Sequence, residues 1–526
     1  MADPQSAVET VQTVEAVQAL KYLLTFSCIA ALVSYPLTNF VALTARRLGF
    51  VDRPDGHHKG HDREVALGGG LAVFLAAFIT FAVEYISSEP LQQLLVKQSP
   101  YLGGLLLAGI WIVGIGLIDD RFGMSGKIKL VGQLIAALIV VAAGLQIHNF
   151  VVFGFEVHLG FWSVPFTVFW LLGAMNSLNL LDGIDGLATT IGIILCATIA
   201  VMALVIGQTA VAIVAAVFVG SLVGFLRFNF PPAKIFLGDA GSMLIGLIVG
   251  ALAIGGSLKG TAAVALAAPL AIWALPMFDS FVAILRRKLV GRSIYATDRG
   301  HLHHRLMALF GKNTRVLAVV AVCCAVTCAG ALMSLFMHND LVALGAVLAV
   351  ICMLIATQAF GHIELKMLLS RFKWLLMALL LRKENQEVSF QIQGTREWDM
   401  LWQSLVEFGE EMELVDIRLD INLAAVQEAY HASWRRPCKS ERRARWRTEI
   451  PLFSDEHVIG RLIVSGSRKA GISSCEAIDR LIEMLEPLEA EIVAMAASCE
   501  HVKSGSNQPT SPGSSMASAS PVPAVK

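Results

Sequence analysis

The chain has 526 residues, of which 56% are hydrophobic and only 16% are charged, and its mean hydropathy is +0.65. Soluble domains carry about 25% charged residues, so this composition excludes an ordinary soluble protein and indicates a membrane protein. The 41 basic and 41 acidic residues cancel, so bulk charge does not suggest a nucleic-acid partner. The nine cysteines show no zinc-site spacing, and we expect no disulfide framework.

The first two thirds of the chain contain apolar runs that could each cross a bilayer, which takes about 20 mostly apolar residues. Residues 1–19 lack the basic start of a cleaved signal peptide, and we expect them outside the cytoplasm. Residues 20–361 are predicted to form a transmembrane domain with about eleven helices. The predicted spans are 20–43, 67–86, 101–118, 129–147, 161–175, 187–205, 208–226, 242–257, 262–285, 315–337 and 341–360.

Arginine and lysine gather in alternate loops between these spans, and such loops are usually cytoplasmic. The basic loops are 44–66, 119–129, 227–241 and 286–315. This distribution predicts an N-terminus outside the cytoplasm and a C-terminus inside it. It agrees with the odd number of predicted spans, which also places the two termini on opposite sides of the membrane.

The chain changes character after the last span. Residues 362–385 form a basic juxtamembrane segment, either a helix on the inner leaflet or a basic end to the last span. Residues 386–500 are predicted to form a soluble, cytoplasmic α+β domain, and residues 501–526 to be a disordered tail. Within the soluble domain we expect helices at 395–408 and 475–497 and strands at 414–421, 449–453 and 458–464. Its basic stretch 434–447 is read as a solvated face rather than a phosphate-binding patch.

Two polar motifs interrupt the first half of the predicted membrane domain. Asp119 and Asp120 directly follow an apolar span, where they could bind Mg²⁺, act as acid and base, or simply cap the helix. Asn176, Asn179, Asp182 and Asp185 recur every three residues, which on a helix would place them along one polar stripe. A polar contact between helices is the alternative for that stripe, but its two carboxylates favour a functional site.

Two further motifs follow. Asp239 lies between glycines at the start of a predicted span, where it could cap the helix or face a metal–phosphate complex. His301, His303, His304 and Arg305 form a compact basic motif. Zinc is one reading of three histidines, yet no fourth ligand is near, and contact with phosphate or uracil fits better.

All four motifs lie at apolar-to-loop junctions on the predicted cytoplasmic side. A membrane-surface site that combines carboxylates, Mg²⁺ and basic residues suits phosphoryl transfer, in which a metal neutralises diphosphate charge and the protein positions the reacting oxygens.

These motifs resemble those of the polyprenyl-phosphate N-acetylhexosamine-1-phosphate transferases, glycosyltransferase family 4, over residues 20–360. Asp119-Asp120 with Ser125 and Lys129 is similar to the family's Asp-Asp signature. The stretch 176–187 (NSLNLLDGIDGL), the GDAGS at 238–242 and the HLHH at 301–304 match its other signatures. The form of the histidine motif, from Asp298 to Leu306, resembles the branch that uses UDP-N-acetylglucosamine. The loop at 51–70 departs from the family pattern, and residues 386–500 lie outside it.

The resemblance implies an all-α polytopic membrane protein and assigns roles to residues. Its implied catalytic residues are Asp119, Asp120 and Asp182, and its implied metal ligands are Asn179 and Asp239, for Mg²⁺ with Mn²⁺ as a candidate substitute. Its implied substrate-binding residues are Lys129, Asn176, Asp185, His301, His303, His304 and Arg305. The expected partners are a UDP-sugar donor, a polyprenyl phosphate acceptor, the membrane, a second copy of the chain as a candidate homodimer, and an unidentified cytoplasmic partner for residues 386–500.

The implied reaction transfers N-acetylglucosamine-1-phosphate from UDP-N-acetylglucosamine to undecaprenyl phosphate and releases UMP. This would be the first membrane step of a cell-surface polysaccharide pathway in the inner membrane of a bacterium, with the active site in the cytoplasm. Three alternatives remain at this stage. They are a phospho-MurNAc-pentapeptide transferase, a transporter with a midplane ion site, and a membrane-anchored sensor or scaffold.

Overall fold

The computed structural model of the chain divides into two compact units, Met1–Lys366 and Met367–Lys526. The residues that it describes are 4–53, 64–87, 92, 99–152, 155–257, 267–289, 300–369, 372, 386–393, 398–411, 414–423, 428–436, 445–454, 457–467, 479 and 483. The tail 501–526, residues 373–385, residues 54–63 of the loop 51–70, Asp298, and the expected helix at 475–497 except for residues 479 and 483 lie outside these residues.

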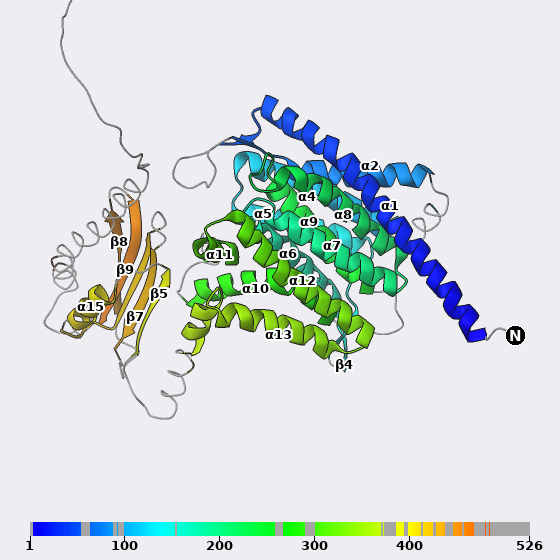
Figure 1. Cartoon of the computed structure of the whole chain (residues 1–526). Helices are drawn as coiled ribbons and strands as arrows, with labels where there is room; N and C mark the ends of the chain where they lie inside the picture. The colour runs from blue at the N-terminus through cyan, green and yellow to red at the C-terminus, as the bar shows by residue number, and fades with distance from the viewer. Residues whose placement is uncertain are drawn as a thin grey trace, which may run out of the picture. The chain divides into compact units, whose positions relative to one another are not determined.

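The first unit is a bundle of long helices (Figure 1). Eight helices of its described part are long and apolar enough to cross a membrane. They are α1 (Pro4–Arg47), α2 (Gly69–Ser87), α4 (Ser99–Phe122), α6 (Ser163–Leu181), α7 (Leu187–Val205), α8 (Thr209–Asn229), α9 (Gly238–Ser257) and α12 (Asn313–Met337). The protein is therefore a multi-pass membrane protein.

The other three predicted spans are also helical, namely α5 (Gly126–Ala142), α10 (Ala267–Leu289) and α13 (Asp340–Ala356). Helices α5 and α13 have 17 residues each, and α10 ends in Arg286, Arg287 and Lys288. None of the three is among the eight helices that meet the length and composition of a span. All eleven predicted segments are thus helices, but the count of eleven transmembrane helices is not confirmed.

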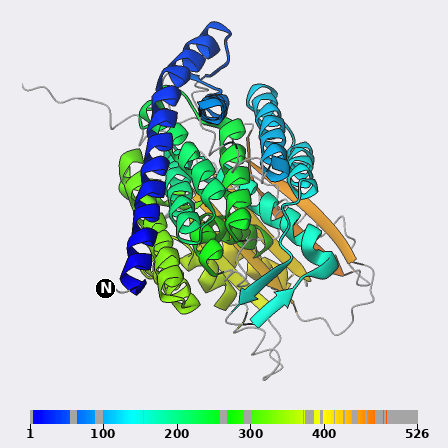
Figure 2. The same ribbon diagram turned by 90° about the vertical axis from the view of Figure 1, so that its right-hand side faces the viewer.

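Helix α9 lies at the centre of the first unit. It packs against α4, α6, α7 and α2, and 83% of its apolar segment is buried, against 33% for α1. Figure 2 shows the helices side by side, with α1 along the outside of the bundle. Large apolar side chains such as Met243, Leu244 and Leu247 are fully buried along α9, so packing fixes this helix in place.

The start of α9 is also tied to the start of α2 by the backbone. Gly69 N donates to Phe236 O at 3.0 Å and Gly70 N donates to Leu237 O at 2.9 Å. Phe236 N in turn donates to Ala66 O at 2.8 Å, beside the short strands β1 (Val51–Asp52) and β2 (Val65–Ala66). These bonds position the segment that leads into Asp239. A second hairpin, β3 (Asn149–Val152) with β4 (Phe155–His158), precedes α6.

The second unit is built on a five-stranded antiparallel sheet in the order β5-β7-β6-β9-β8. Its strands are β5 (Gln386–Gln393), β6 (Asp416–Leu423), β7 (Glu428–Arg435), β8 (Arg445–Ser454) and β9 (His457–Ser467), and its described helix is α15 (Asp399–Glu411). Trp398, Trp402 and Tyr430 are at most 1% exposed in its core. The predicted helix 395–408 and the three predicted strands are confirmed, whereas β5 and β7 were not predicted. The last two of the predicted strands, β8 and β9, pair antiparallel.

Candidate active site at the helix ends

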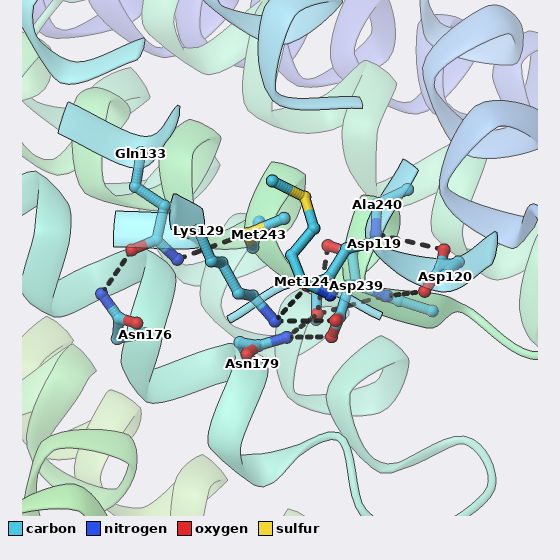
Figure 3. A network of polar contacts seen from close by, with 12 residues as sticks. Asp119, Asp120, Met124, Lys129, Gln133, Asn176, Asn179, Asp239, Ala240 and Met243 are labelled. Carbon is cyan, nitrogen blue, oxygen red and sulfur yellow. Dashed lines mark hydrogen bonds and ion pairs between the residues drawn. The ribbon is translucent and has the colours of Figure 1, made fainter. Parts of the chain in front are cut away.

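Lys129 joins two of the predicted site carboxylates. Its Nζ lies 3.0 Å from Asp119 Oδ2 and 2.7 Å from Asp239 Oδ2 (Figure 3). Asp119 is in the last turn of α4, Lys129 in the first turn of α5 and Asp239 in the first turn of α9. The side chains of Lys129 and Asp119 are 16% and 7% exposed, so the charges are largely shielded from water and depend on one another. Asp119 also accepts a hydrogen bond from Met124 N at 2.6 Å.

Asp120 contacts the backbone at the start of α9 and not Lys129. Its Oδ1 accepts from Asp239 N at 2.8 Å, and its Oδ2 lies 3.5 Å from Ala240 N. The first amides of a helix lack partners within the helix and carry partial positive charge, so a carboxylate stabilises them. Gly238 has a φ of +73°, and a Cβ there would lie 2.5 Å from Asp120 Oδ2. Glycine at this position therefore lets Asp120 reach the helix end and set the direction of Asp239.

The two asparagines of α6 have different partners. Asn179 Nδ2 donates to Asp239 Oδ1 and, at 3.0 Å, to Ser242 Oγ, so this side chain belongs to the carboxylate cluster. Asn176 is one turn earlier, and its Nδ2 donates to Gln133 Oε1 of α5 at 2.8 Å (Figure 3). The contacts of Asn176 are thus those of a polar link between helices, and its expected role in substrate binding stays a prediction.

The predicted helical stripe through Asp182 and Asp185 is wrong. Helix α6 ends at Leu181, and residues 182–186 form a loop before α7. The glycines of the sequence DGIDG favour this break, and Gly186 has a φ of +74°. Asp185 Oδ2 accepts from Ala233 N at 2.9 Å and so fastens the loop to the segment before α9.

Asp182 has an unusual electrostatic environment. Loss of contact with water raises its pKa well above the ordinary value, and the negative charges of Asp239, Asp120 and Asp185 raise it further. Lys129 opposes this effect but does not cancel it. A carboxyl that resists ionisation among other carboxylates is typical of a site that receives a cation or a proton.

The histidine motif packs against this loop. His301 precedes the short helix α11 (Leu302–Phe310), whose first turn contains His303, His304 and Arg305. A Cβ on Gly183 would lie 2.0 Å from His303 Nε2, so only glycine allows the imidazole to approach the backbone of the 182–186 loop so closely. The rings of His301 and His303 lie parallel with centroids 6.0 Å apart, and His304 lies 4.2 Å from His303. Burial and the two neighbouring histidines lower the pKa of His303 well below its ordinary value, so it is uncharged at neutral pH.

The fold therefore brings together residues from all four motifs. Asp119, Lys129, Asn179 and Asp239 are in direct contact, Asp120 and Asp185 anchor the segments around them, and His303 adjoins Gly183. Two polar residues of this region were missed. Gln133 joins Asn176 and lies 3.3 Å from Met243 Sδ, and Asp279 bonds to His301. A lone polar residue within an apolar run is the signal that could have found each of them.

The donor atoms suit a hard cation that is also bound by substrate. Among the described residues, no group of three or more His, Cys, Asp or Glu is placed to hold a metal. Mg²⁺, however, is usually bound by one or two carboxylates together with substrate phosphates and water. The carboxylates of Asp239 and Asp119 with the amide of Asn179 form such a partial set, and the Lys129 ammonium between the two carboxylates shows that a positive charge is accommodated there.

Comparisons with known proteins agree with this site. The family model described as glycosyl transferase family 4 matches residues 102–257, which contain three of the four motifs. A probable undecaprenyl-phosphate N-acetylglucosaminyl 1-phosphate transferase of Bacillus subtilis is 34% identical over 296 residues, 56% of this chain and 78% of that protein. A decaprenyl-phosphate N-acetylglucosaminephosphotransferase of Mycobacterium tuberculosis is 34% identical, over 59% of this chain and 81% of that protein. An undecaprenyl-phosphate alpha-N-acetylglucosaminyl 1-phosphate transferase of Escherichia coli K12 is 30% identical, over 51% and 72%. From these matches and the shared motifs, the chain belongs to glycosyl transferase family 4.

Proposed function

We propose that this protein transfers N-acetylglucosamine-1-phosphate from UDP-N-acetylglucosamine to a polyprenyl phosphate and releases UMP. The observation that carries the proposal is the cluster of Asp119, Lys129, Asn179 and Asp239 at the ends of four apolar helices. The relatives' names supply the substrates, because each of the three describes an N-acetylglucosamine phosphate transferase that acts on a polyprenyl phosphate. They favour this donor over the UDP-MurNAc-pentapeptide of the alternative.

The proposed reaction is a displacement at phosphorus. An oxygen of the polyprenyl phosphate attacks the β-phosphorus of the donor, the bond from that phosphorus to the bridging oxygen breaks, and UMP leaves with that oxygen. One phosphoanhydride replaces another, so the reaction is nearly isoenergetic. A phosphate with a second pKa near about 6 is largely ionised at neutral pH, so attack needs no strong base.

The residues of the cluster bind and orient the two phosphate groups in this mechanism. Lys129 donates hydrogen bonds to phosphate oxygens as its contacts to Asp119 and Asp239 are exchanged for them. Asp182 orients the donor beside the histidine motif, and His303, uncharged, contacts the nucleotide or the sugar rather than neutralising phosphate charge. Asp120 acts on Asp239 through the start of α9.

Mg²⁺ is the proposed cofactor, held by Asp239 and by Asn179 through its Oδ1. When it is bound, it neutralises charge on the diphosphate and on the departing UMP. The two Asp239 oxygens now accept from Asn179 and Lys129, so the same atoms that a cation would need are already directed into the site.

We place the site on the cytoplasmic side of a bacterial inner membrane. The support is the positive charge of the loops beside the motifs, including Arg121, Lys127 and Lys234. A UDP-sugar made in the cytoplasm would then reach the site directly, and the polyprenyl tail would remain in the bilayer.

The test is transfer of radiolabelled sugar phosphate from UDP-N-acetylglucosamine to undecaprenyl phosphate by the purified protein, with Mg²⁺ or EDTA. Wild type is expected to form product only with Mg²⁺, and Asp239→Asn to lose it. Asp340→Asn, at a partly exposed aspartate in the first turn of α13, is the matched control and should remain active. If product forms only with UDP-MurNAc-pentapeptide, the reaction class stands but the proposed donor is wrong. If no product forms with either donor under conditions in which a related transferase is active, the proposed function is rejected.

A further inference from the structure

A buried carboxylate outside the sequence motifs holds the histidine motif in place. Asp279 of α10 is 0% exposed. Its Oδ2 lies 3.0 Å from His301 Nδ1, and its Oδ1 accepts from Leu302 N at 2.7 Å. One carboxylate thus binds both the side chain that precedes α11 and the first backbone amide of that helix.

A carboxylate that is removed from water at this position needs compensating interactions. Burying a carboxylate lowers the stability of the fold unless good hydrogen bonds or an opposite charge compensate for the lost contact with water. Asp279 gains this compensation from the partial positive charge at the start of α11 and from the imidazole N–H. Beyond its bond to the first amide of α11, Asp279 contributes the contact with His301.

The bond decides which nitrogen of His301 can meet a substrate. An ionised carboxylate only accepts hydrogen bonds, so His301 Nδ1 carries the proton that points at Asp279. In the uncharged imidazole, Nε2 is then the nitrogen with a free lone pair. A carboxylate behind a working histidine fixes both the ring orientation and the tautomer in this way.

A second contact from the same helix supports the same loop. Arg286 lies two turns after Asp279, is 3% exposed, and forms an ion pair with Glu364 that is almost completely buried. A Cβ on Gly300 would lie 2.2 Å from the Arg286 guanidinium carbon, so Arg286 packs directly against the residue before His301. Helix α10 therefore supports the chain at Gly300, His301 and Leu302, three consecutive residues.

The support reaches the active site through stacked rings. His301 lies parallel to His303, and His303 occupies the space beside Gly183, next to Asp182. A rotation of the His301 ring would therefore disturb the imidazole that packs against the 182–186 loop.

We propose that Asp279 is a positioning residue for the sugar-phosphate transfer, which orients His301 and holds it in the Nδ1-protonated tautomer. This inference rests on the proposed function, because it assigns a partner to one of the histidines of that site. Asp279 is 0% exposed, so its effect on the reaction is exerted through His301.

The test is a double-mutant cycle with Asp279→Asn and His301→Gln in the full-length protein. In Asp279→Asn the remaining carboxamide oxygen still accepts from Leu302 N, whereas its NH₂ group faces His301 Nδ1 and favours the opposite tautomer. We expect kcat/KM for UDP-N-acetylglucosamine to fall about 10- to 100-fold, the usual effect of removing a partner that orients a histidine. The KM for polyprenyl phosphate should not change. Combined with His301→Gln, Asp279→Asn should cause no further loss.

Three outcomes overturn the inference while leaving the proposed function intact. The first is an active wild type with a fully active Asp279→Asn. The second is an equal fold-loss from Asp279→Asn in the presence and absence of His301. The third is a fall in activity that only follows lower thermal stability, judged against Asp340→Asn as the matched carboxylate-to-amide control. Inactive wild type with both donors would instead reject the function itself.

Discussion

Lys129 and Asp239 meet across the start of two helices that are 110 residues apart in sequence, with Nζ 2.7 Å from Oδ2. The same ammonium reaches Asp119 at 3.0 Å, so two carboxylates share one positive charge in a largely buried site. The cluster is consequently short of positive charge, because Asp120 and Asp182 lie close enough to contribute to the same field. A bound cation would relieve that imbalance. Replacing one of these carboxylates by a neutral side chain would relieve it as well.

Replacing Lys129 should abolish activity, and the variant should remain folded when Mg²⁺ is present. Lys129→Gln is expected to reduce kcat/KM roughly 100-fold or more, the scale for losing a donor that stabilises developing charge. Lys127→Gln is the control, because Lys127 is exposed on the same helix. Initial rates with both substrates varied would measure the effect. Equal losses in the two variants would show that general surface charge, and not the Lys129 contacts, is responsible.

Asp182 should make the substrate-free protein less stable at high pH. Its folded-state pKa is raised, so its contribution to stability is fully present below the ordinary carboxyl pKa of 3.8 and is lost as pH rises through the folded-state value. Asp182→Asn resembles the protonated form and escapes this loss. In EDTA at pH 8 we expect Asp182→Asn to unfold at a higher temperature than wild type but to be inactive.

The difference in unfolding temperature between Asp182→Asn and wild type should shrink as the pH is lowered towards 4, since wild-type Asp182 is then protonated. Thermal unfolding in detergent across that range measures it. A difference that is constant with pH, or a variant less stable than wild type at pH 8, would contradict the electrostatic explanation.

The contact between Gly183 and His303 should be intolerant of a single methyl group. Gly183→Ala places a Cβ within 2.0 Å of His303 Nε2, and His303 is only 2% exposed, so the ring must move. Displacements of about 1 Å can cost up to 100-fold in rate, and we expect a loss of roughly that size in kcat/KM for the donor. Gly173→Ala on α6 is the control because nothing lies within 4 Å of its new Cβ. Full activity of Gly183→Ala would show that His303 can move without consequence.

The sequence predicted which residues form the site better than it predicted how they pair. Motif composition and the apolar spans identified Asp119, Asp239 and Asn179, and each of these residues lies near the end of a helix as expected. The hydrogen bond that Asp239 N donates to Asp120 Oδ1 joins positions 119 residues apart, and no local sequence pattern encodes such a pairing. Asp120 was expected to act as a catalytic residue, but its described contacts are those of a helix cap, so that role stays a prediction.

Helix periodicity failed where glycine ended a helix early. The three-residue spacing of polar residues favoured a continuous stripe through Asp185, yet Gly183 and Gly186 end that helix at Leu181. In the second unit, β7 was missed because its polar face carries His431 and Arg435, although Tyr430, Ala432 and Trp434 alternate into the core. Asp279 was missed because a single polar residue in an apolar run carries no periodic signal.

The second unit should unfold independently of the transferase site. On the other face of its sheet, Asp420 is 3% exposed, pairs with His431, and accepts from Arg461 Nε at 3.1 Å. Asp420→Ala removes the partner of a buried histidine and of a half-buried arginine, which is expected to cost about 3 kcal/mol of folding free energy in this unit. Asp416→Ala, whose Arg418 and Arg435 partners are 36% and 51% exposed, should cost at most about 1 kcal/mol.

Limited proteolysis of the full-length protein measures this difference, with cleavage within residues 386–467 expected to be faster in Asp420→Ala than in Asp416→Ala. Transferase activity should be unchanged in both, because every described contact of the carboxylate cluster lies within the first unit. Equal cleavage rates would contradict the stabilising role of Asp420. A loss of activity in Asp420→Ala that follows its loss of structure would instead show that the second unit supports catalysis.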